Sequence, residues 1–205
     1  MHFVISIIIL FLSFIYTIHR LEIFQRKFNS TIFFLFTNLS VILSFFYYLL
    51  NLIYYSVYKE ENFLLVTCKQ YVTFYMLVVM LVYHFVLVPN EKRKKTANRC
   101  YSLSSNVAHI ILPCLLFLDW FFFTKHQKLS IFTLILSLLY PIFYCCLVFY
   151  KGIKKTGKAF AHSSTHYPYF FLDIELLGLK KVIMTVIILL IILFLLGYLF
   201  LCVNN

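Results

Sequence analysis

Six long apolar stretches, separated by shorter polar segments, dominate the chain. They run at about residues 3–19, 32–58, 71–88, 103–123, 129–150 and 182–203. About 20 apolar residues in a helix cross the ~30 Å hydrocarbon core of a bilayer. The pattern therefore predicts an all-α, polytopic membrane protein, in which a bundle of six transmembrane helices forms a single domain over residues 1–205. Because most connections are short, neighbouring helices are expected to be antiparallel.

Positive charge falls mainly on one side of the predicted membrane. Of the 18 Lys and Arg residues, 14 follow the first, third and fifth stretches, and the remaining four are Lys59, Lys69, Lys125 and Lys128. An excess of Lys and Arg marks the cytoplasmic side. We therefore predict a multi-pass protein of the cell (plasma) membrane with both termini extracytoplasmic.

Composition changes the picture by excluding other classes of protein. The chain is 63% hydrophobic and only 12% charged, whereas soluble domains carry roughly 25% charged residues. Its net charge of +11 is explained by topology, so the expected partners are membrane lipids and not nucleic acid. The six cysteines show no zinc or disulfide spacing, and we predict no cofactor and no metal. His162 and His166 could form a metal pair, but no third ligand accompanies them.

Several polar residues are predicted to share one layer inside the membrane. Thr37 and His109 each lie early in a helix that starts at the cytoplasmic side, which places both about 8–12 Å deep at 1.5 Å rise per residue. Three further side chains could support them, namely Asn38, Asn106 and His84. A hydroxyl beside an imidazole is the minimum for nucleophilic acyl transfer, and an amide could orient the histidine or donate to an oxyanion.

Each of these residues also has a structural interpretation. A threonine in a membrane helix commonly bonds its own backbone or joins two helices. Pro113 has no N–H and leaves the His109 carbonyl without its usual helical partner, so His109 could serve only to cap that defect. His84 could be an interfacial residue. Asp119, about ten residues beyond His109, could pair with Lys125 or Lys128, or belong to an ion or proton pathway.

The long fifth connection carries an unusually aromatic segment, YPYFFLD, at residues 167–173. Such a segment is too apolar for a solvated tail, and we expect it to fold back against the inner face of the bundle. Tyr167, Pro168, Tyr169 and Asp173 would then form an inner-loop segment or lid.

Five short strings, in order, resemble one family: the bacterial membrane proteins called Pr-six-Pr, related to the eukaryotic androgen-induced integral membrane proteins. The strings are FLFTNLS at 34–40, AHIILP at 108–113, LDW at 118–120, YPIFY at 140–144 and YPYFFLD at 167–173. The resemblance implies a six-helix fold and, in eukaryotic relatives, a threonine hydrolase that cleaves fatty-acid esters of hydroxy fatty acids. The family's nucleophile would match Thr37 and its catalytic histidine would match His109.

Three hypotheses follow. The first is a membrane-embedded hydrolase of lipid esters, with Thr37 as nucleophile and His109 as base. The alternative is a non-enzymatic protein that binds lipid or transports a small solute or protons. The third is a structural bundle whose polar residues only join helices. The hydrolase requires Thr37 to lie within reach of His109, and a transporter requires a polar path from His109 to Asp119.

Overall fold

The computed structural model describes residues 2–22, 30–60, 62–93, 102–124, 130–155 and 166–204. These residues contain helices and turns and no strand, which confirms the all-α prediction. Six helices are long and apolar enough to cross a membrane: Phe3–Leu21, Phe36–Tyr58, Phe63–Asn90, Leu103–Phe123, Ile131–Lys154 and Leu179–Val203. The chain is therefore a multi-pass membrane protein, while its orientation and the choice of membrane stay predictions of the charge pattern.

Most membrane helices are regular, and two are interrupted by π-helical turns. The first half of the chain forms α1 (His2–Leu21), the 3-10 turn η2 (Ser30–Phe34), α2 (Phe36–Tyr58), α3 (Phe63–Val82), the π-helical η3 (Tyr83–Leu87) and α4 (Val88–Arg93). The second half forms α5 (Leu103–Asn106), the π-helical η5 (Val107–Ile111), α6 (Leu112–Phe123), α7 (Ile131–Lys154), the 3-10 turn η6 (Phe170–Leu172), α8 (Ile174–Leu177) and α9 (Leu179–Asn204).

The third span begins at Phe63 and not near residue 71, which corrects the predicted boundary. Asn62 caps this helix, because its side-chain oxygen accepts the Leu64 N–H at 2.8 Å. Lys69 therefore lies inside a membrane helix and not in a connection, where the charge count placed it. The helix can include Lys69 because another buried side chain pairs with its charge, as described below.

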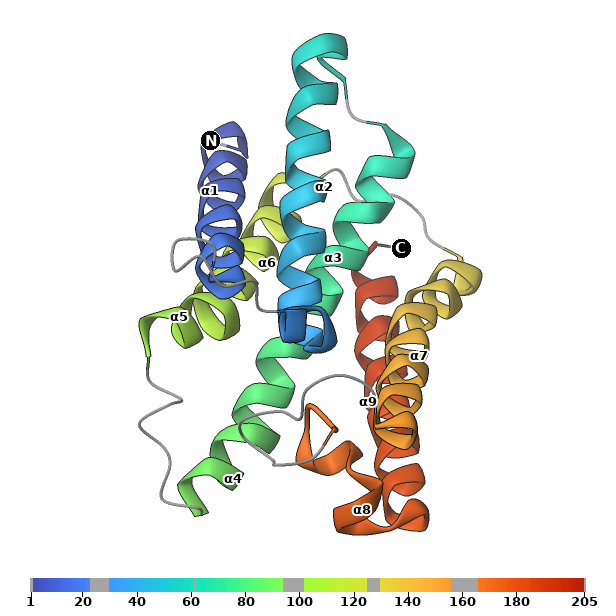
Figure 1. Cartoon of the computed structure of the whole chain (residues 1–205). Coiled ribbons are helices and arrows are strands. Elements are labelled where there is room, and N and C mark those ends of the chain that lie inside the picture. Colours follow the sequence, from blue (N-terminus) through green and yellow to red (C-terminus); the bar gives the residue numbers. More distant parts are fainter. Residues whose placement is uncertain are drawn as a thin grey trace. The chain divides into compact units, whose positions relative to one another are not determined.

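The chain divides into two compact units, Met1–Lys125 and His126–Asn205, each of which is described by itself. In the first unit, α1 packs against α2 and α6, and α3 packs against α2 and α6 (Figure 1). In the second unit, α7 lies beside α9, and α8 and η6 also pack on α9 (Figure 1). The predicted single domain stays a prediction.

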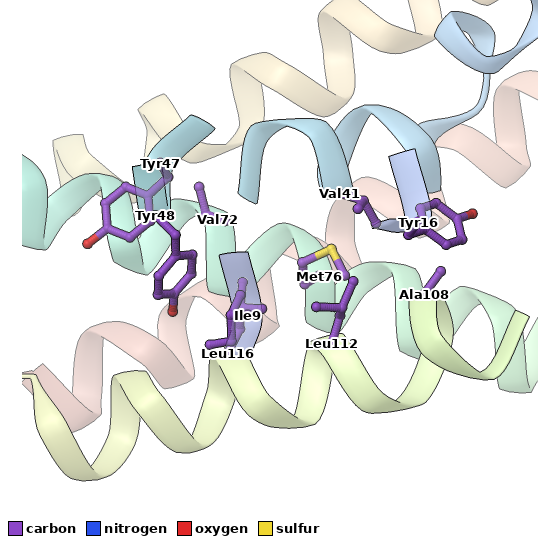
Figure 2. Close-up of a cluster of buried hydrophobic side chains, with 10 residues drawn as sticks. All are labelled: Ile9, Tyr16, Val41, Tyr47, Tyr48, Val72, Met76, Ala108, Leu112 and Leu116. Carbon is purple, nitrogen blue, oxygen red and sulfur yellow. The ribbon is translucent and has the colours of Figure 1, made fainter. Parts of the chain in front are cut away.

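A buried apolar cluster joins the four membrane helices of the first unit (Figure 2). The cluster includes Ala108 of η5 and, on α6, Leu112 and Leu116. None of these three side chains has exposed surface. These residues recur every four positions, so they line one face of the helix. The face of α6 that carries this stripe thus points into the unit.

Candidate functional site

Two π-helical turns place aromatic rings against each other inside the first unit. Each turn ends two residues before a proline: η3 ends at Leu87 before Pro89, and η5 ends at Ile111 before Pro113. A proline cannot donate to the carbonyl four residues back and its ring crowds that carbonyl. A widened turn is one way in which a helix accommodates such a break, and π-helical turns occur frequently at functional sites.

The two turns contribute Tyr83 and His109, whose rings stack. Their centroids are 3.9 Å apart and their planes differ by 19°. Tyr83 is also linked to the other side of the site, since the Ser105 hydroxyl donates to the Tyr83 oxygen at 2.9 Å. This stacking and bonding fix the plane of the His109 imidazole.

The contacts of His109 determine which ring nitrogen carries the proton. Nδ1 lies 2.8 Å from the Ser105 carbonyl oxygen, which can only accept a hydrogen bond. In the neutral ring, Nδ1 therefore carries the hydrogen and Nε2 has the lone pair. Nε2 lies 3.3 Å from Thr37 Oγ1. The structure thus directs a basic nitrogen at a buried threonine hydroxyl, in the arrangement that nucleophilic acyl transfer needs.

Thr37 lies in the first turn of α2 and is almost fully buried, with 8% of its surface exposed. The first turn of an α-helix leaves N–H groups without partners inside the helix. Next to it, Asn38 is buried and its Oδ1 accepts the Tyr16 hydroxyl at 2.8 Å. Asn38 therefore ties α2 to α1 beside Thr37, where a supporting side chain was predicted.

The other two predicted supporting residues do not bond to this pair. His84 is exposed, and its Nδ1 bonds the Met80 carbonyl of its own helix at 2.8 Å. Asn106 is half-buried one turn before His109, and no hydrogen bond joins its side chain to Thr37 or His109. Their predicted supporting role thus stays a prediction.

A second polar site, which the sequence did not predict, surrounds Asp119. Lys69 Nζ lies 2.7 Å from Asp119 Oδ2, and their side chains are 4% and 0% exposed. The Tyr48 hydroxyl donates to the same oxygen at 2.8 Å, and Lys69 also donates to the Asp119 carbonyl at 3.4 Å. Asp119 thus has a partner other than the predicted Lys125 or Lys128, both of which lie outside the described residues. Buried charges in membrane helices are rare and usually functional.

Sequence signals for this second site existed, but they were divided between two elements. Lys69 follows Thr67 and Cys68 in a polar interruption of the apolar pattern. This interruption placed the predicted start of the third membrane helix near residue 71. A helix begun at Asn62, a favourable cap residue, would have placed the lysine in the membrane, where it would require a carboxylate partner.

The aromatic segment 167–173 belongs to the second unit and packs there. Tyr167 is buried, and its ring lies directly on the backbone of Gly152 in α7, where a Cβ would overlap it. Burial raises the pKa of the Tyr167 hydroxyl, and the charges of Asp173 and Glu175 add to that effect. Asp173 caps α8 by accepting the Glu175 N–H at 2.9 Å. Pro168 and Tyr169 are half-buried.

The segment is thus folded back within its own unit, and a role for it as a lid stays a prediction. The prediction that the chain binds no metal is not tested by the His162 and His166 pair, since His162 lies outside the described residues and only the half-buried His166 is placed.

The chain matches no family model, no curated protein and no solved structure. Its resemblance to Pr-six-Pr proteins therefore stays a prediction, and the function has to be argued from the two polar sites of the first unit.

Proposed function

We propose that the chain is a membrane-embedded hydrolase of fatty-acid (lipid) esters, in which Thr37 is the nucleophile and His109 the general base. The observation that carries this proposal is the 3.3 Å contact between Thr37 Oγ1 and His109 Nε2. The distance is at the long end for a hydrogen bond. Catalytic contacts of this kind tighten when substrate is bound.

The reaction would proceed in two halves. His109 Nε2 takes the Thr37 proton while Oγ1 attacks the ester carbonyl, and the imidazolium then returns the proton to the leaving alkoxide. This half-reaction yields an acyl-threonine and releases the alcohol. Water then attacks the acyl-threonine with His109 again as base, which releases the fatty acid and restores the Thr37 hydroxyl.

Two features of the site support this mechanism. The Ser105 carbonyl accepts from Nδ1 at 2.8 Å, so it would stabilise the imidazolium and hold its orientation, as a carboxylate does in a serine-protease triad. Thr37 lies in the first turn of α2, where the helix dipole and the backbone N–H groups favour negative charge. A developing oxyanion at this position would therefore be stabilised.

Labelling with a fluorophosphonate, which reacts with activated hydroxyls, tests the proposal in purified protein in detergent. We expect wild type to be labelled, Thr37→Ala and His109→Ala to lose labelling, and Thr37→Ser to retain it. Thr17→Ala is a matched control, because that threonine bonds the Ser13 carbonyl of its own helix at 2.7 Å. His166→Ala, at a half-buried position of the second unit, is the matched histidine control, and both controls should be labelled like wild type.

Size-exclusion profiles and circular dichroism would establish that each variant is folded. If folded wild type is not labelled, or if Thr37→Ala is labelled as strongly as Thr17→Ala, the hydrolase proposal is wrong. Thr37 would then be a helix-packing residue, and the predicted alternative, a lipid-binding or transport protein, would replace the hydrolase.

A further inference from the structure

The two polar sites of the first unit stand on the same pair of helical segments. Thr37 and Tyr48 are both on α2, while His109 precedes α6 and Asp119 lies within it. The sites are eleven residues apart along α2 and ten along the other segment, which corresponds to about 15–17 Å along the helix axes. That distance is roughly half of the ~30 Å hydrocarbon core.

A file of buried hydroxyl groups on α2 runs from one site to the other. Its members are Thr37, Ser40, Ser44 and Tyr48, spaced by three, four and four residues, so they lie on one face of the helix. All four are buried, with exposed fractions of 8%, 1%, 0% and 0%. Thr37 contacts His109 at one end, and Tyr48 donates to Asp119 at the other.

On α2 and on the helix that carries Lys69, two buried hydroxyls have no hydrogen-bond partner among the described residues. One is Ser40 Oγ in the file itself, and the other is Thr73 Oγ1 on the adjacent helix α3, one turn beyond Lys69. Buried polar groups in proteins are almost always satisfied by protein or by ordered water. A polar site with room for it commonly holds such water, bonded to two to four polar groups.

Apolar side chains enclose the same region. Figure 2 shows Tyr48 and Val72 at one end of the buried cluster and Val41 and Ala108 at the other, so the cluster extends along the length that the file covers. Leu112 and Leu116 form the corresponding face of α6. Between His109 and Asp119 the α6 segment carries no hydroxyl, so a polar path along it depends on the hydroxyls of α2 and α3.

We propose that this hydroxyl file, with ordered water at Ser40 and Thr73, conducts protons between His109 and Asp119. Each hydroxyl or water accepts a proton on its oxygen and passes its own hydrogen onward, so one proton enters and one leaves. The Ser44 hydroxyl donates to the Ser40 carbonyl at 2.8 Å, and it turns away from that carbonyl to pass its hydrogen on. At the far end the Asp119 carboxylate accepts the proton. The neutral acid no longer holds Lys69 electrostatically, and loss of the proton to the outside restores the ion pair.

The groups that face each terminus are consistent with this assignment. Lys69 and Tyr48 face Asp119, with Tyr47 next to Tyr48 in a T-shaped ring contact. At the other end, Tyr83 and Ser105 contact His109, and His84 and Arg20 lie near enough to act on it electrostatically. The inference does not depend on Thr37 being a nucleophile, because the file requires only its hydroxyl.

Proton flux into phospholipid vesicles that contain the purified full chain and a trapped pH dye tests the inference, with a valinomycin-imposed potassium potential as driving force. Wild type should acidify the vesicles faster than protein-free vesicles do. Thr73→Val, which keeps the shape and removes the hydroxyl, should lower the flux about tenfold, equivalent to about 1.4 kcal/mol in a barrier. Ser40→Val should do the same, while Thr73→Ser should keep the wild-type rate.

The matched control is Thr67→Val, since Thr67 is half-buried on the same helix and its hydroxyl donates to the Phe63 carbonyl at 3.0 Å. Its flux should equal that of wild type. Folded wild type without flux above the protein-free level would overturn the inference, as would Thr73→Val and Ser40→Val variants that conduct like Thr67→Val.

A second measurement covers variants that fail to fold. Ser44→Cys, placed in a chain whose native cysteines are replaced, should exchange its thiol hydrogen for deuterium in D2O, because this exchange requires only contact with water; the loss of the S–H infrared band measures it. Leu43→Cys, on the neighbouring lipid-facing side of α2 with Leu43 38% exposed, is the control and should keep its S–H band for longer in vesicles. A Ser44→Cys thiol that exchanges no faster than that of Leu43→Cys would show that no water reaches the file and would overturn the inference.

Discussion

The two polar sites of the first unit connect the same helices but differ in charge and in closeness of contact. At the site around Asp119, the Lys69 and Tyr48 side chains both contact one carboxylate oxygen, at 2.7 and 2.8 Å. At the site around Thr37, a neutral hydroxyl and a neutral imidazole lie 3.3 Å apart. The charged site is closed by its own partners, whereas the neutral site holds a donor and an acceptor at a distance that a substrate can shorten.

The difference indicates that the site around Asp119 stabilises the protein, whereas the site around Thr37 is reactive. Charges inside a bilayer are costly unless they are paired, so removing one partner of the charged site should mainly cost stability. The neutral pair contributes little to stability because its single hydrogen bond is long. Substitutions of this pair should mainly reduce the reactivity of the Thr37 hydroxyl. Four substitutions test this division, from the largest expected loss of stability to the smallest.

The largest effect is expected for Asp119→Ala. This substitution leaves the Lys69 ammonium buried without its carboxylate, and breaking a buried ion pair in this way typically costs about 3–5 kcal/mol. The free energy of unfolding, measured by sodium dodecyl sulfate titration in mixed micelles, checks the loss. The double variant Lys69→Met/Asp119→Leu replaces both charges with apolar groups and should recover most of it. A single variant as stable as wild type would show that the ion pair does not hold these helices.

A smaller loss is expected for Tyr48→Phe, which removes one hydrogen bond to the Asp119 carboxylate and keeps the ring. Hydrogen bonds to charged groups contribute about 1.5–3 kcal/mol. Tyr58→Phe is the matched control, because Tyr58 is 62% exposed at the end of the same helix. The same unfolding titration should separate the two variants by at least 1 kcal/mol, on the order of that contribution. Equal stabilities would mean that the ion pair needs no third partner.

The two sites also differ in how far they could be predicted from the sequence. A shared level for Thr37 and His109 could be predicted, because two residues at equal depth from the same ends of two helices lie at one level, and the family resemblance also paired them. Depth does not specify rotation, so His84 was expected beside them although it faces outward and bonds the Met80 carbonyl. The sequence predicts that Pro113 interrupts the helical hydrogen bonding. It does not predict the π-helical turn at Val107–Ile111 that accommodates the interruption.

The pairing of Lys69 with Asp119 could not be predicted in the same way. A charged residue lowers the hydropathy of its segment, so the apolar pattern predicts a helix that starts only after Lys69. Only the three-dimensional packing of α3 on α6 brings the carboxylate within 2.7 Å. This ion pair is thus hidden from hydropathy because Lys69 obscures the start of its own helix, although the span that carries Asp119 was predicted.

A modest loss is expected for Tyr16→Phe, at the edge of the neutral site. The variant removes the hydrogen bond from the Tyr16 hydroxyl to Asn38 Oδ1, now 2.8 Å long, which should cost about 0.5–1.5 kcal/mol. Because Asn38 adjoins Thr37, fluorophosphonate labelling should slow without disappearing. Stability is measured by the same titration, and Tyr58→Phe again serves as control. A loss as large as that of Tyr48→Phe would contradict the distinction between the two sites.

The smallest loss of stability, and the largest loss of chemistry, is expected for Thr37→Val. Valine keeps the branched shape of threonine and removes only the hydroxyl, so the change in unfolding free energy should stay below about 1 kcal/mol, the contribution of one neutral hydrogen bond. Labelling should nevertheless be abolished, because no nucleophilic oxygen faces His109 Nε2. Thr17→Val provides the control, with a comparable change in stability and unchanged labelling. If Thr37→Val instead destabilises the protein as much as Asp119→Ala does, the threonine is a structural residue, and the contrast between a stabilising and a reactive site does not hold.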